Sequence, residues 1–170
     1  QIDIQVISQV ADLLINSKKP IIYAGGGVVN AGLEASNLLT ELVNLLEAPV
    51  TLTLMGLGAV SNKNKNFLGM LGMHGTYEAN LAMHNCDVML NVGARFDDRV
   101  TGRLNAFAPK SKKIHIDIDK SSINKVVHVD FGIVGDCKEV LCLLIKEIKK
   151  NHNIKNMQSK SSWWGQINNW

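Results

Sequence analysis

Short apolar runs that alternate with amphipathic segments constrain the fold of this chain more than any other feature. The runs, rich in β-branched residues, lie at residues 20–24, 49–54, 87–92, 113–118 and 127–134. The first leads directly into Gly25, Gly26 and Gly27, and the third leads into Gly93. Strands that alternate with helices across short loops indicate a parallel sheet covered on both faces. We therefore predict an α/β fold, doubly wound and mainly parallel, in three layers.

The segments between these runs have the spacing of helices. Residues 2–16 carry apolar side chains at positions 2, 6, 10, 13 and 14, which form one helical stripe. Similar patterns predict helices at residues 33–46, 76–85 and 137–149. A shorter helix is predicted at 121–126, with Ser121 or Ser122 as its N-cap. With 170 residues, of which 46% are hydrophobic, the chain suits one compact domain.

The last residues differ in composition from this pattern. We assign residues 1–150 to the α/β domain and 151–170 to a linker and a short helix, because 151–162 are polar. Trp163, Ile167 and Trp170 share one face of that helix. This face either folds back on the domain or docks on a partner surface, and we favour the second. The chain does not begin with Met, so we expect it to start inside a longer protein.

Composition excludes several functional classes. No apolar run approaches the roughly 20 residues of a membrane span, so we expect no membrane association. Lysines cluster only modestly near the carboxyl end and lack an aromatic platform, which argues against nucleic-acid binding. Cys86, Cys137 and Cys142 contain no Cys-x-x-Cys pair, and their odd number indicates reduced thiols.

The stretch at residues 68–102 combines glycines with charged side chains around an apolar strand. It holds His74 together with Arg95, Asp97, Asp98 and Arg99. Glycine allows a ligand to approach the backbone, and arginine binds pyrophosphate or carboxylate groups. In an open parallel sheet, ligands bind beyond the carboxyl ends of the strands. Other predicted strands end there in glycines or carboxylates, at 25–27, 56–58, 117–119 and 135–136, which predicts an extended dinucleotide across that edge.

Each motif also has a structural interpretation. Residues 25–30 fail the G-x-G-x-x-G pattern at its last position, so these glycines alternatively form only a tight turn. Asp117 and Asp119 alternatively cap the next helix, and the Arg and Asp residues of 95–99 alternatively form a solvated ion-pair cluster. His74 and Glu78 are predicted on one helical face without a third metal ligand, so we predict no metal site. No nucleophile elbow or Walker-type loop occurs.

Three motifs resemble the large catalytic subunits of acetolactate synthases, also called acetohydroxyacid synthases. They are MLGMHGTYEAN at 70–80, GARFDDR at 93–99 and HIDID at 115–119. The resemblance extends over essentially the whole chain and is to the Rossmann-like central domain of these thiamine-diphosphate enzymes. It implies that this domain binds FAD through Gly25, Gly26, Gly27, Thr53, Leu54, Met55, Leu71, Gly72, Met73, His74, Gly93, Ala94, Arg95, Asp97, Arg99, Val100, Asp117, Ile118, Gly135 and Asp136. It also implies that Met73, Asp98 and Arg99 lie near the substrate channel.

The same resemblance implies a larger enzyme. Such enzymes condense two pyruvates, or pyruvate and 2-oxobutyrate, in branched-chain amino-acid biosynthesis, and their FAD performs no redox step. Thiamine diphosphate and Mg²⁺ are bound by flanking N- and C-terminal domains, so we expect no catalytic residue in this chain and no activity from it alone. The implied partners are a second copy in a homodimer or tetramer and a small regulatory subunit. The implied location is the cytoplasm, or the plastid for an algal or plant source.

Three other functions remain open. The chain alternatively is the middle domain of a related thiamine-diphosphate carboligase or oxidase, or a freestanding nucleotide-binding domain such as a sirtuin-like deacetylase. A sirtuin needs four zinc cysteines, whereas this chain has three in an unsuitable spacing. A non-catalytic interaction module is supported only by the face that contains Trp163 and Trp170.

Overall fold

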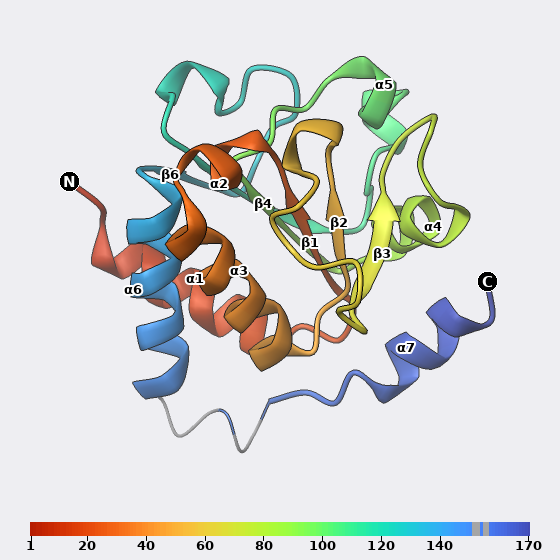
Figure 1. Cartoon of the computed structure of the whole chain (residues 1–170), viewed down its shortest axis with the longest axis horizontal. Helices are drawn as coiled ribbons and strands as arrows, with labels where there is room; N and C mark the ends of the chain where they lie inside the picture. The colour runs from red at the N-terminus through yellow and green to blue at the C-terminus, as the bar shows by residue number, and fades with distance from the viewer. Residues whose placement is uncertain (151–153, 155–156) are drawn as a thin grey trace.

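The computed structural model describes residues 1–150, 154 and 157–170 and contains a six-stranded parallel sheet (Figure 1). Its strand order is β3-β2-β1-β4-β5-β6. The strands are β1 (Pro20–Ala24), β2 (Val50–Leu52), β3 (Phe67–Met70), β4 (Val88–Val92), β5 (Lys112–Asp117) and β6 (Phe131–Val134). The order reverses between β1 and β4, and such a switch point is where doubly wound sheets bind ligands. The prediction of a doubly wound parallel α/β fold is confirmed.

Helices cover both faces of the sheet, as Figure 1 shows. They are α1 (Ile4–Asn16), α2 (Gly26–Asn30), α3 (Leu33–Leu46), α4 (Tyr77–Asn85), α5 (Asp98–Thr101), α6 (Cys137–Lys150) and α7 (Ser161–Asn168). Short 3₁₀ turns are η1 (Leu54–Gly56), η2 (Leu104–Ala106) and η3 (Lys120–Ser122). Helices α1, α3 and α6 pack on one face and bury the larger core. Helices α4 and α7 lie with the segment around Phe96 on the other face, over a smaller core.

Local sequence explains most of these boundaries. Every residue of β1 and of β4 is buried, as expected for central strands that are covered on both faces. Asp3 accepts a hydrogen bond from the N–H of Gln5 and caps α1. Thr76 accepts one from the N–H of Ala79 and caps α4, which begins at Tyr77, one residue after its predicted start.

Four local predictions need correction. Strand β3 was not predicted, because it has only four residues, includes Gly69 at a φ of 91°, and is only partly buried. The run at 49–54 forms a strand only as far as Leu52, since Thr53 caps η1. The run at 127–134 forms a strand only from Phe131. The predicted helix at 121–126 is the turn η3, and its N-cap is Asp119, not Ser121 or Ser122.

The carboxyl-terminal helix folds back onto this domain. In α7, Trp163 is 1% exposed, and its Nε1 donates a hydrogen bond of 3.0 Å to the carbonyl of Pro20. Ile167 is also buried, and the Trp170 ring meets the Trp163 ring edge-on. The expectation that this face docks elsewhere is therefore wrong for Trp163 and Ile167, because both side chains join the smaller core between the sheet and α4.

The predicted linker at 151–162 lies partly outside the described residues. Within the described ranges, none of the helices has the length and apolar composition that crossing a membrane requires.

Candidate functional site

The loops after β1 and β4 meet at the switch point of the sheet. The N–H of Gly25 donates to the carbonyl of Val92, and the N–H of Gly27 donates to the carbonyl of Gly93, both at 3.0 Å. A Cβ on Gly25 would lie 2.6 Å from the Gly93 carbonyl oxygen and from the Cα of Ala94. Glycine at position 25 is thus required for the close packing of the two loops. Two N–H groups that were predicted to face a ligand already have backbone acceptors.

A side-chain clamp shapes the loop after β4. The Asn91 amide donates to the carbonyl of Ala94 at 2.8 Å and accepts from its N–H at 3.0 Å. Gly93 lies between them with a φ of 61°, in the left-handed region that favours glycine. Beyond the clamp, Ala94 and Phe96 are buried, whereas Arg95 and Asp97 are exposed. The loop therefore directs its two charged side chains out of the core, toward solvent.

The charged residues of this loop are not paired with one another. Asp97 accepts a hydrogen bond of 2.8 Å from the N–H of Arg99 and so caps α5. Across the described part of the chain, no ion pair involves Arg95, Asp97, Asp98 or Arg99. The alternative of a solvated ion-pair cluster is therefore wrong. Both guanidinium groups are available to an anionic ligand.

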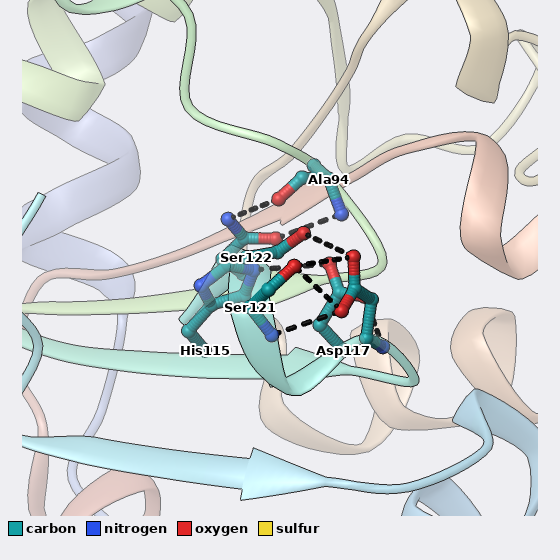
Figure 2. A network of polar contacts seen from close by, with 7 residues as sticks. Ala94, His115, Asp117, Ser121 and Ser122 are labelled. Atoms are coloured by element: carbon teal, nitrogen blue, oxygen red, sulfur yellow. Dashed lines mark hydrogen bonds and ion pairs between the residues drawn. The ribbon is translucent and has the colours of Figure 1, made fainter. Parts of the chain in front are cut away.

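The carboxyl end of β5 contains a second polar group, shown in Figure 2. Asp117 accepts a hydrogen bond of 2.9 Å from the N–H of Asp119, and its Oδ2 lies 3.4 Å from Nε2 of the buried His115. Burial lowers the pKa of His115, an effect that the Asp117 carboxylate and the Ala94 carbonyl partly oppose. Asp119 caps η3, and its hydrogen bonds from Ser121 lower its carboxyl pKa. Of the two aspartates, only Asp119 has the capping role.

The loop between β3 and α4 closes the same edge. Asn80 holds it by accepting from the N–H of Gly72 at 3.1 Å and donating to its carbonyl at 3.0 Å. The N–H of Met73 donates to the carbonyl of Arg99, which joins this loop to α5. His74 is exposed in the turn before α4. The prediction that His74 and Glu78 share a helical face is wrong, because the helix begins at Tyr77.

Large apolar side chains are unusually exposed along this edge. Four predicted site residues have exposed fractions of about two thirds or more, namely Leu54 (68%), Met55 (76%), Met73 (75%) and Ile118 (70%). They follow β2, β3 and β5, so they come from loops on both sides of the switch point. Clustered exposed apolar surface indicates a ligand or an interface.

Most other predicted site residues have structural contacts at the same edge. Thr53 accepts from the N–H of Gly56, and Asp136 accepts from the N–H of Lys138 at the start of α6. Leu71 is buried, Val100 is half-buried, and Gly135 follows β6. Cys137 is buried there, and burial raises the pKa of its thiol to about 12. An inert thiol agrees with the expectation of reduced cysteines.

A cavity of about 240 Å³ lies beside the loop after β4, and its lining residues are Arg95, Phe96, Asp97, Ser122, Lys125 and Val126. Sequence reasoning did not assign Ser122 or Lys125 to the site, because Ser122 ends η3 and Lys125 follows it, so neither directly follows a strand. It also missed the Asn91 clamp, since an asparagine within an apolar strand has no recognised motif. Within the described ranges, no three His, Cys, Asp or Glu side chains are grouped as a metal site would require.

Comparison with known proteins gives a consistent family. Residues 7–144 match the family model described as the thiamine pyrophosphate enzyme, central domain. The chain is 45% identical over 164 residues to the acetolactate synthase large subunit of Buchnera aphidicola subsp. Schizaphis graminum, and 44% identical over 164 residues to the acetolactate synthase isozyme 3 large subunit of Escherichia coli. It is 41% identical over 167 residues to the acetolactate synthase large subunit of Cyanidium caldarium.

These alignments cover 96% of this chain for the first two relatives and 98% for the third, but only 28% of each relative. The chain thus spans little more than a quarter of the length of the relatives it matches. The family model, in contrast, describes a single domain and covers most of the chain. The chain belongs to the thiamine pyrophosphate enzyme family, as a central domain of that family.

Proposed function

We propose that this chain is the FAD-holding central domain of an acetolactate synthase large subunit. One observation carries the proposal: unpaired arginines and exposed apolar side chains converge at the carboxyl edge of a doubly wound sheet. Arg95 and Arg99 have no ion-pair partner among the described residues, and Met55 and Met73 are about three-quarters exposed. The similarity to three acetolactate synthase large subunits supports the same assignment.

The residues present fit the chemistry of FAD. Its pyrophosphate requires fixed positive charge, which Arg95 and Arg99 supply. Its ribose hydroxyls require acceptors such as Asp117 and Asp136, which follow β5 and β6. Its flat rings require apolar surface, which the exposed side chains of Leu54, Met55, Met73 and Ile118 offer. The proposed set includes the remaining site residues of the sequence prediction: Gly25, Gly26, Gly27, Thr53, Leu71, Gly72, His74, Gly93, Ala94, Asp97, Val100 and Gly135.

We propose further that the whole protein condenses two pyruvates, or pyruvate and 2-oxobutyrate, with loss of carbon dioxide. Thiamine diphosphate with Mg²⁺ would supply the carbanion chemistry in the flanking domains of the same chain. The role of residues 1–150 is to hold and orient FAD, and residues 151–170 lead toward a following catalytic domain. Met73, Asp98 and Arg99 would line the substrate channel, where their exposure leaves them accessible.

The proposed assembly is a homodimer or tetramer of the full-length chain that binds a small regulatory subunit. The proposed location is the cytoplasm, or the plastid in an algal or plant cell. Light scattering of the purified full-length protein, with and without the small subunit, tests the assembly. A monomer under both conditions would contradict it.

An absorbance spectrum of the purified protein tests the cofactor assignment. We expect a bound flavin spectrum that survives gel filtration, and release of FAD rather than FMN on denaturation. A protein that binds neither FAD nor ADP, added at high concentration, would contradict the assignment.

Turnover of the full-length protein tests the activity. With pyruvate, thiamine diphosphate and Mg²⁺, we expect acetolactate to form, while residues 1–170 alone remain inactive. Oxidation of pyruvate without carbon–carbon bond formation would instead favour a related oxidase. Deacetylation by the 170-residue chain alone would favour a freestanding domain.

A further inference from the structure

Four buried polar residues form a row across the central strands. Tyr23 on β1 pairs in register with Thr51 on β2 and with Asn91 on β4, and Asn91 pairs with His115 on β5. Paired residues of parallel strands point to the same face, about 4.8 Å apart. Here that face is the one covered by Phe96, and all four residues are 0% exposed. Burying polar side chains in the middle of a core costs free energy unless they are hydrogen-bonded.

Most of the row lacks hydrogen-bond partners. The Tyr23 hydroxyl, the Thr51 hydroxyl and both ring nitrogens of His115 are buried without an aligned partner among the described residues. Asn91 is the exception, because its amide clamps Ala94. Each unsatisfied buried group costs about 1–3 kcal/mol, so three such residues are a substantial burden on stability.

The row contacts two side chains of the carboxyl edge, Phe96 and Asp117. The Phe96 ring lies 5.3 Å from the His115 ring, edge-on, and 6.3 Å from the Tyr23 ring. Phe96 is the buried residue between Arg95 and Asp97, so its contacts set the direction of both. Nε2 of His115 lies 3.4 Å from the Asp117 carboxylate (Figure 2). His115 therefore touches the support of Arg95 and also the strand-end carboxylate.

We propose that His115, together with Asn91, is a positioning residue that holds Asp117 and the loop bearing Arg95 at the spacing the ribose and pyrophosphate of FAD require. The inference rests on the proposed function, because it assumes that FAD binds at this edge. It adds to the proposed site two residues that do not contact the cofactor, because His115 and Asn91 are completely buried. His115 thus leaves both ring nitrogens without a hydrogen-bond partner in the core, while its ring contacts Phe96 and approaches Asp117.

Replacing His115 by leucine separates positioning from structural support. Leucine has a similar volume and no polar atoms, so His115→Leu removes two ring nitrogens that lack hydrogen bonds, together with the 3.4 Å approach of Nε2 to Asp117. We expect a thermal midpoint equal to or above that of the wild type in the full-length protein. We also expect the dissociation constant for FAD, measured by flavin fluorescence, to rise about tenfold, the size of one lost polar contact. His115→Gln keeps a donor and an acceptor and should restore most of the affinity.

Thr51→Val is the matched control. Thr51 lies in the same row with the same burial and an equally unsatisfied hydroxyl, but it contacts neither Phe96 nor Asp117 in the contacts described above. We expect Thr51→Val to raise the thermal midpoint and to leave FAD affinity unchanged. A loss of affinity in this variant equal to that of His115→Leu would overturn the proposal, because any change in the row would then have the same effect.

A double-mutant cycle with Asp117→Asn provides the decisive readout. If His115 acts through Asp117, the double variant with His115→Leu should bind FAD no more weakly than Asp117→Asn alone. Fully additive losses would overturn the proposal, and so would an unfolded His115→Leu protein or one with wild-type affinity. If the wild type itself binds no FAD, the proposed function fails and the inference falls with it. If the wild type binds FAD and His115→Leu binds it equally well, the proposed function stands and only this inference is refuted.

Discussion

The two edges of the sheet differ in whether their polar groups have partners within the chain. At the amino edge, polar groups are satisfied by the chain itself: the buried Lys160 ammonium donates to the carbonyls of Ser17 and Gln158 at 2.7 Å, and Trp163 donates to that of Pro20. Asp87 accepts from the N–H groups of Lys18 and Lys19 at 2.7 and 2.9 Å. At the carboxyl edge, arginines and large apolar side chains remain exposed.

This difference assigns folding stability to the amino edge and ligand binding to the carboxyl edge. The amino edge buries the Trp163 indole ring and satisfies the charges of Lys160 and Asp87 with backbone hydrogen bonds, which stabilises the folded state. The carboxyl edge leaves cations unpaired and apolar area in water, which contributes little to folding but suits a ligand with anionic and flat aromatic parts. Substitutions at the amino edge should therefore change unfolding, and those at the carboxyl edge should change cofactor binding.

The largest expected effect is a loss of stability from a substitution at the amino edge. Trp163→Ala removes a ring that is 1% exposed, its hydrogen bond and its contact with the Lys19 ammonium, 5.5 Å from the ring centre. We expect the free energy of unfolding to fall by about 3–5 kcal/mol, measured by denaturant titration. Trp164→Phe, which loses only a hydrogen bond to the Glu47 carbonyl, should cost about 1 kcal/mol. If the two variants lost equal stability, α7 would not depend on Trp163.

A substitution where the loops after β1 and β4 meet should reduce both the stability of the fold and the binding of FAD. In Gly25→Ala, the new Cβ would lie 2.6 Å from backbone atoms of Gly93 and Ala94, so the two loops must separate. We expect a loss of roughly 1–3 kcal/mol in unfolding free energy together with loss of bound FAD. Gly165→Ala in α7 is the control, because no atom lies within 4 Å of its added Cβ. That variant should gain stability, by up to about 1 kcal/mol, and keep its FAD.

Arg95→Ala should weaken FAD binding and leave stability nearly unchanged. The side chain is exposed and unpaired among the described residues, so stability should change by less than about 0.5 kcal/mol. Loss of a charged contact should weaken FAD binding by about 1.5–3 kcal/mol, measured by flavin retention and titration. Arg103→Ala, also exposed but outside the proposed site, should bind FAD normally. Equal losses in both variants would indicate a general charge effect.

The smallest expected effect is a pH dependence from His115. Burial lowers its folded-state pKa below the ordinary value of about 6.5, although the Asp117 carboxylate opposes this. The unfolded state then takes up the proton first, so stability is present above pH ~6.5 and falls as the pH drops below it. A single proton limits the slope to about 1.4 kcal/mol per pH unit. His115→Leu should flatten this part of the stability profile, and an unchanged profile would show that His115 does not titrate there.

Much of the fold was predictable from local pattern. Strand β1 and helix α3 have the predicted bounds, because their apolar spacing and terminal glycine and proline residues are local signals. Strand β3 was missed, since its pairing with β2 supplies the stability that its own residues do not. The docking of α7 was also predicted wrongly. Pro20, which accepts the hydrogen bond of Trp163, lies 143 positions earlier, and no local pattern records such a contact.

For the candidate site, the sequence by itself determined which residues reach the edge. Strand periodicity and the glycines place Gly25, Gly93, Arg95 and Asp117 at strand ends, whatever packs around them. Only the tertiary structure decided how they are held: the packing of Gly25 against the loop of Gly93, the Asn91 clamp, and the row that ends at His115. The reason is that backbone propensity acts over a few residues, whereas burial and polar pairing are set by strands distant in the chain.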